Sequence, residues 1–288
     1  MSVVLVVKVS EGLVLGADSA ATISGRIERP EGVQEGVLKT YYNARKLLQV
    51  GDFPIGVLLW GTPFIGSRTI DSLIREWEYE RHWQSQKDYR EEYRESKEEN
   101  FWVESCAKSL SSHLHKKYSE EFENQSGQQP PMIGVVVAGY SHRGLFPEIW
   151  RFVLPVDRPG QIHNQRPDRD GKPDFGASWL GLTDAIVRLH FGRDDRVVKI
   201  ISEKFEIPEE KLHEALLPLQ YQIPFFTMPL QDAIEYAHYV LNVTIGRYRF
   251  VIGPELCGGP IEIAAITQRG FHWISHKTWS LGGKEGAK

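Results

Sequence analysis

The sequence has few residues that could build covalent or metal cross-links. It holds two cysteines in 288 residues, Cys106 and Cys257, which lie far apart and form no CxxC pair. This argues against a secreted disulfide framework and against a cysteine zinc site. The acidic stretch 168–171 lacks the spacing and the terminal glutamate of a calcium loop. We therefore expect a cytoplasmic protein without a metal or another cofactor.

Long apolar runs and a large charge of one sign are also missing. The apolar segment 3–7 is interrupted by Lys8, is too short to span a bilayer, and lacks the basic start of a signal peptide. The formal net charge is −4, with no basic stripe interleaved with aromatic residues. Neither a membrane nor a nucleic acid is expected as a partner. The balance of 41% hydrophobic and 25% charged residues is that of a folded globular chain.

Several familiar catalytic motifs are absent. The sequence contains no GxSxG, no HExxH, no GxxxxGK[ST], and no GxGxxG between a strand and a helix. Four of the ten histidines, His113, His115, His272 and His276, lie on a charged helix or beside the last strand, where structural or solvated roles are expected. The chemistry must therefore come from another set of residues.

Hydrophobic periodicity and turn residues predict strands and helices that are grouped along the chain. The expected order is strands at 3–9, 13–17, 46–50 and 55–60, helices at 64–83 and 101–122, strands at 132–140 and 148–154, helices at 183–190, 194–205, 208–219 and 230–248, and strands at 260–267 and 270–275. Segments 26–40 and 158–174 are expected to be loops. This grouping favours an α+β fold with two antiparallel sheets covered by helices, not alternating βαβ units.

Three polar residues interrupt the apolar opening of the chain. Ser2 precedes the first strand, Asp18 follows the second, and Lys46 opens the third. Because a hairpin brings the start of its first strand beside the end of its second, Ser2 and Asp18 are expected at one sheet edge. A free α-amino group could deprotonate the serine hydroxyl, a nearby lysine favours the oxyanion, and an aspartate orients that lysine. These residue types suit an N-terminal nucleophile.

Four segments resemble proteasome β-type subunits of the N-terminal-nucleophile (Ntn) hydrolase family, in particular a divergent bacterial-type proteasome-like peptidase. Residues 12–22 show the apolar strand followed by Ala-Asp and then Ala-Thr, and the spacing from Ser2 to Asp18 matches the spacing from nucleophile to aspartate. The Arg-Lys-Leu-Leu segment at 45–48 resembles the lysine strand of that family. Residues 55–61 lead to its glycine turn, and 257–263 resemble its Ser-Gly-Gly segment.

The resemblance implies a single domain over residues 1–288, folded as a four-layered αββα sandwich with insertions near 26–40, 80–100, 155–175 and 195–225. It implies that Ser2 is the nucleophile once Met1 is removed, and that the Gly61 amide helps bind the oxyanion. Thr183 would take the place of a serine near the amine of the nucleophile. The family's usual threonine is a serine here, and Glu255 would replace its late aspartate, displaced by one position.

The implied function is hydrolysis of peptide or amide bonds through an acyl-enzyme, with a peptide or protein substrate. The implied partners are further copies in a homo-oligomeric ring and an unfoldase or regulatory protein. Two alternatives stay open: a catalytically inactive ring or scaffold subunit, in which Lys46 and Asp18 form only a buried ion pair, and a small-molecule amidase.

Overall fold

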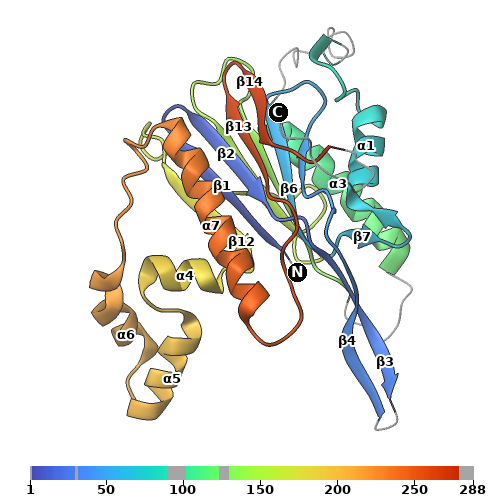
Figure 1. The fold of residues 1–288 in the computed structure, drawn as a ribbon. Coiled ribbons are helices and arrows are strands. Elements are labelled where there is room, and N and C mark those ends of the chain that lie inside the picture. The colour runs from blue at the N-terminus through green and yellow to red at the C-terminus, as the bar shows by residue number, and fades with distance from the viewer. Residues whose placement is uncertain (1, 30–31, 88, 90–101, 123–129, 279–288) are drawn as a thin grey trace, which may run out of the picture.

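The computed structural model describes residues 2–29, 32–87, 89, 102–122 and 130–278 (Figure 1). Met1 and most of the expected insertion at 80–100 lie outside these residues. Every strand pair in the described residues is antiparallel. The architecture is mixed α/β, and the described residues form two five-stranded sheets and two two-stranded ones.

The first sheet joins the beginning of the described chain to its end. Its strand order is β12 (Gly176–Gly181), β1 (Val3–Val9), β2 (Gly12–Ala17), β13 (Glu262–Thr267) and β14 (Gly270–Ser275). Strands β1 and β2 form the hairpin expected from the sequence, with Val4 opposite Ala17. Both strands are buried along their whole length, which explains their nearly continuous apolar sequences.

The second sheet is built from the middle of the chain. Its order is β11 (His163–Asn164), β10 (Glu148–Leu154), β9 (Ile133–Gly139), β6 (Ile55–Gly61) and β5 (Leu47–Gln49). One apolar cluster contains side chains of both sheets, among them Val4 and Val6 of β1, Leu58 of β6 and Val136 of β9, all with no exposed surface. Burying each such side chain contributes about 1.5–3 kcal/mol relative to exposure.

Each sheet also has a cluster shared with helices. Helix α7 (Leu230–Phe250) packs on β1 and β2 through its buried residues, such as Val240 and Leu241. Helix α1 (Ile70–Glu80) and helix α3 (Val103–Phe122) share a cluster with the second sheet, in which Trp77 is fully buried. Figure 1 shows α7 beside one sheet and α1 and α3 beside the other.

Three further helices follow β12 in the chain, and the first of them, α4, contacts α7. Helix α4 (Asp184–Phe191) ends at Gly192, whose φ of 68° requires the left-handed region, and α5 (Asp195–Phe205) begins where Asp194 accepts a hydrogen bond from the Val197 N–H at 2.9 Å. Helix α6 (Glu209–Leu216) and the 3-10 turn η1 (Leu217–Leu219) follow. Figure 1 shows α5 and α6 away from both sheets.

The expectation of a loop at 26–40 is wrong. Strands β3 (Ala21–Arg29) and β4 (Gly32–Tyr41) pair along that segment and project from the body as a hairpin (Figure 1). Gly32 begins β4 and Gly36 lies within it opposite Gly25, and Pro30 lies outside the described residues. Strand β12 was not expected either, because its Gly-Ala-Ser start resembles a loop.

The helix expected at 64–83 is shorter at its start. Strands β7 (Phe64–Ile65) and β8 (Arg68–Thr69) precede α1, and the Thr69 hydroxyl accepts a hydrogen bond from the Ser72 N–H at 3.2 Å as the N-cap. Among the helices in the described ranges, none combines the length and apolar character needed to cross a membrane.

Candidate active site

The β1–β2 hairpin places Ser2 and Asp18 at the same sheet edge. The Asp18 N–H donates to the Val3 carbonyl oxygen at 3.2 Å, so the hairpin pairing continues to the residue next to Ser2. On the other side of β1, the Leu182 N–H donates to the Ser2 carbonyl oxygen at 2.8 Å. The backbone of Ser2 is therefore held between β2 and the end of β12.

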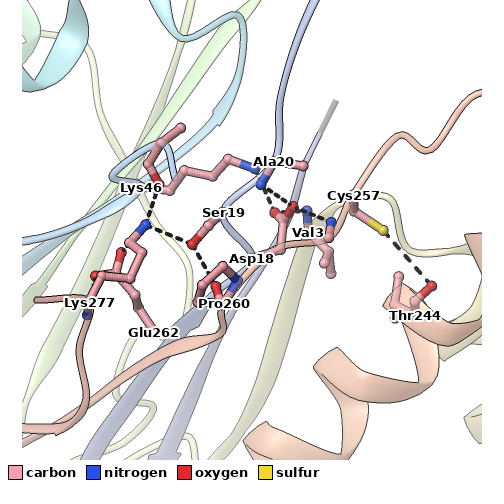
Figure 2. A network of polar contacts seen from close by, with 12 residues as sticks. Val3, Asp18, Ser19, Ala20, Lys46, Thr244, Cys257, Pro260, Glu262 and Lys277 are labelled. Carbon is pink, nitrogen blue, oxygen red and sulfur yellow. Dashed lines mark hydrogen bonds and ion pairs between the residues drawn. The ribbon is translucent and has the colours of Figure 1, made fainter. Parts of the chain in front are cut away.

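The Asp18 carboxylate gathers four donors from four parts of the chain (Figure 2). Its Oδ1 accepts from the Val3 N–H at 3.0 Å and from Lys46 Nζ at 2.7 Å. Its Oδ2 accepts from the Ala20 N–H at 3.1 Å and from the Gly258 N–H at 3.0 Å. Because polar groups that leave water need hydrogen-bond partners, these four bonds satisfy and fix the fully buried carboxylate.

Lys46 is the cation of this cluster and is 3% exposed. Burial lowers the pKa of Lys46, and the neighbouring Asp18 carboxylate opposes that shift. Its backbone is anchored by the Leu59 N–H, which donates to the Lys46 carbonyl oxygen at 2.9 Å. Lysine with a lowered pKa can exchange a proton nearer to neutral pH than a surface lysine can.

Ser2 and Lys46 line one cavity of about 780 Å³. Its other lining residues include apolar side chains of β6 and the segment after it, Trp60, Pro63 and Phe64. No hydrogen bond joins Lys46 Nζ to the Ser2 hydroxyl among the bonds within the described residues. The structure thus brings the two side chains to one cavity and pairs Lys46 with Asp18.

Gly61 ends β6 at the wall of the same cavity. Its φ is 91°, and a Cβ at this position would lie 2.3 Å from the Met132 carbonyl oxygen. Only glycine fits this backbone without displacement. The expected glycine turn is present, and Gly61 borders the cavity that Ser2 lines.

The two supporting residues expected from the sequence lie in different places. Thr183 is the N-cap of α4 and directly follows Leu182, which holds the Ser2 carbonyl. Glu255 is exposed, and its Oε2 accepts from the Tyr42 hydroxyl at 2.6 Å. Glu255 is therefore bonded to Tyr42, which lines the cavity, and is not among the donors and partners of Asp18.

Sequence reasoning missed a second polar cluster beside the first. Lys277 Nζ donates to the Ser19 hydroxyl at 2.7 Å and lies 3.1 Å from Glu262 Oε2 (Figure 2). Glu262 opens β13 and has no exposed surface. A glutamate at the head of the otherwise apolar strand Glu-Ile-Ala-Ala-Ile was the available signal, since a buried charge needs a partner.

A three-residue group on α1 and α3 has the types that bind metal ions: Glu76, Glu80 and His113. Glu76 is already paired with Lys117 at 2.6 Å and with Arg68. Hydrogen bonds from Lys117 and Arg68 lower the pKa of Glu76 to about 2. The two cations occupy the carboxylate, so this group favours ion pairing over a metal centre.

Comparisons with known proteins identify a similar fold for this chain but no protein family. No protein-family model matches the chain, and no curated protein matches it. Among solved structures, it is similar to a chain of the Anbu complex from Pseudomonas aeruginosa, which is described as a helical assembly. The two chains are 14% identical with a TM-score of 0.53, over 96% of this chain and 86% of the other.

These findings correct the identification as a proteasome β-type subunit. The matched motifs describe a tight hairpin, a buried carboxylate and a glycine turn, and such local geometry can recur without close kinship. The structural match is with an Anbu chain, at an identity that establishes the fold alone. The chain therefore shares the fold of a subunit of the Anbu complex.

Proposed function

We propose that this protein is an N-terminal serine hydrolase that cleaves peptide or amide bonds through an acyl-enzyme on Ser2. The observation that carries the proposal is the buried Lys46–Asp18 ion pair, 2.7 Å long, at the cavity that Ser2 lines. The proposal requires cleavage of the bond between Met1 and Ser2, because only that cleavage frees the Ser2 amine.

The reaction begins with proton transfer from the Ser2 hydroxyl to the Ser2 amine as Oγ attacks the substrate carbonyl carbon. When the tetrahedral intermediate collapses, the carbon–nitrogen bond breaks and the leaving nitrogen takes that proton. Water then attacks the ester and gives its proton to the same amine. The bond between the acyl carbon and Oγ then breaks, the amine returns the proton to Oγ, and the acid product departs.

The other residues act on charge and position. The Lys46 ammonium stabilises the deprotonated Ser2 oxygen, and Asp18 orients Lys46 through the bond between them. The Gly61 amide contributes to an oxyanion site, where one well-placed donor typically changes the rate by about 10²–10³-fold. Thr183 supports the Ser2 amine. Glu255 supports Tyr42, which lines the cavity, through the bond between them.

The proposed architecture is the four-layered αββα sandwich, formed as one domain over residues 1–288. Its support is the set of three apolar clusters, one containing both sheets, one containing α7 with the first sheet, and one containing α1 and α3 with the second. The shared fold with an Anbu chain is consistent with this arrangement.

A cavity of about 780 Å³ with apolar and aromatic lining suits a peptide side chain. We propose a peptide or protein substrate, and assembly of the chain into a homo-oligomer. The second proposal rests on the helical assembly formed by the structural neighbour. A regulatory partner that delivers substrate belongs to the same proposal.

The test uses protein cleaved before Ser2 and an electrophilic peptide probe, with labelling located by mass spectrometry. Cleaved wild-type protein and Ser10→Ala, in the exposed turn after β1, should be labelled at Ser2. Ser2→Ala and uncleaved protein should not be labelled, and Lys46→Arg should be labelled slowly. Labelling that survives in Ser2→Ala contradicts the nucleophile assignment, and no labelling of any form favours the scaffold alternative.

A further inference from the structure

Lys277 forms hydrogen bonds with the two segments that carry the proposed catalytic residues Asp18 and Lys46. It lies two residues beyond β14, and 12% of its side chain is exposed. Its Nζ donates to the Ser19 hydroxyl at 2.7 Å and to the Ala44 carbonyl oxygen at 2.6 Å. Ser19 follows Asp18 directly, and Ala44 precedes Lys46 by two residues. One ammonium group thus contacts both segments.

Further bonds make this contact a closed network (Figure 2). The Ala44 N–H donates to the Ser19 carbonyl oxygen at 3.0 Å, and the Ser19 hydroxyl donates to the Pro260 carbonyl oxygen at 2.5 Å. Glu262 lies within ion-pair distance of Lys277 at 3.1 Å and of His276 at 2.9 Å. The Lys277 ammonium is therefore held by Ser19, Ala44 and Glu262 together.

We propose that Lys277 is a positioning residue that holds the Asp18 and Lys46 segments together at the cavity that Ser2 lines. Lys277 lines the same cavity as Ser2 and Lys46, so its positive charge acts within the proposed active site. A catalytic role for Lys277 rests on the proposed function of Ser2 as the nucleophile. The effect of Lys277 on the titration of Lys46 can be measured without catalytic turnover.

The groups that face Lys46 define the expected sign. Burial is the largest influence and lowers the pKa of Lys46, Asp18 raises it, and the positive charge of Lys277 lowers it further. The Cys257 thiol also lies nearby. Around Lys277 are Glu262, Arg45 and Asp18, and burial lowers the pKa of Lys277 as well. Two cations that share one low-dielectric region repel each other, so removing one favours protonation of the other.

The test follows the Lys46 side-chain signal by NMR during a pH titration of protein with isotope-labelled lysine, assigned with Lys46→Arg. All samples carry Ser2→Ala, so the outcome does not depend on catalysis. Lys277→Gln and Lys277→Met should raise the Lys46 pKa by about 0.5 unit or more. Lys277→Arg, the matched control, keeps the charge and should leave the titration within about 0.2 unit of the parent.

A Lys46 titration that is the same in the parent and in both neutral variants would falsify the proposal. Folding is checked by the backbone amide spectrum, and either neutral variant that folds decides the question. Loss of the fold in both variants also contradicts the proposal, which assigns Lys277 a local effect. The probe-labelling experiment is independent: if Ser2 is not labelled but Lys46 shifts as expected, the proposed function fails and the positioning role stands.

Discussion

Lys46 Nζ and Asp18 Oδ1 lie 2.7 Å apart, with 4% of one side chain and none of the other exposed. Both charged groups are buried away from water. Three backbone N–H groups donate the other hydrogen bonds to the Asp18 carboxylate. The desolvation cost of such a pair can equal or exceed its mutual attraction. Its two partners therefore depend on each other much more than an exposed pair would.

The first prediction concerns that dependence. Asp18→Asn removes the carboxylate charge and leaves a buried ammonium unpaired, so the free energy of unfolding should fall by about 3–5 kcal/mol. The double variant Asp18→Asn/Lys46→Met removes both charges and should recover a large part of that loss. Urea denaturation at pH 7 measures both. Equal losses in the single and the double variant would show that the ion pair is not the cause.

The second prediction is a pH dependence with a defined sign. Burial lowers the pKa of Lys46 in the folded state below the unfolded value of about 10.4. Between these two values the unfolded state binds more protons, so Lys46 makes folding more favourable as pH rises. The stability of the wild type relative to Lys46→Met should therefore increase with pH up to about 10.4. Denaturant unfolding at several pH values measures it, and a flat difference contradicts the assignment.

The third prediction contrasts two glycines. Gly61→Ala should destabilise the protein by about 1–3 kcal/mol, because φ is 91° and the new Cβ would meet the Met132 carbonyl oxygen. Gly246 lies inside α7, and apart from the adjoining helix backbone no described atom lies within 4 Å of the position that a Cβ would take there, so Gly246→Ala should stabilise by about 0.5–1 kcal/mol. Thermal melts compare the two. Similar effects of both substitutions would refute this reasoning.

The fourth prediction concerns the thiols. Cys106 and Cys257 are both buried, and burial raises the pKa of Cys257 to about 12 and the pKa of Cys106 well above its ordinary value. Because the thiolate is the reactive form, neither should react with a thiol reagent at pH 8 in the folded protein. Both should react in urea. Rapid reaction of one thiol without denaturant would mean that its surroundings open in solution.

The sequence predicted those parts of the fold whose signals are local. The β1–β2 hairpin has buried apolar strands around a turn, and α7 has an apolar stripe at helical spacing. Strands β3 and β4 were missed because the proline and glycines of 26–40 were read as loop residues, although apolar and polar residues alternate along 21–28. Strand β12 was missed because pairing with β1 stabilises it. The residues of β12 alone do not indicate that pairing.

The candidate site could likewise be predicted only where its sequence signals are local. The hairpin register fixes Ser2 next to the Asp18 edge, and the spacing of Lys46 allows the 2.7 Å contact. The Lys277 contacts join residues more than 230 positions apart, and no local pattern encodes them. The position of Glu255 could not be predicted either, because its partner Tyr42 stands at the end of the unexpected hairpin.

The bond from the Gly258 N–H to Asp18 has a consequence for the timing of biosynthesis. The two residues are 240 positions apart, so the carboxylate cannot have all its donors until the ribosome has reached residue 258. At roughly 5–20 residues per second, that interval is about 10–50 seconds. During it, Asp18 and Lys46 must remain hydrated or be paired incompletely. A nascent chain therefore carries Ser2, Asp18 and Lys46 well before it can use them.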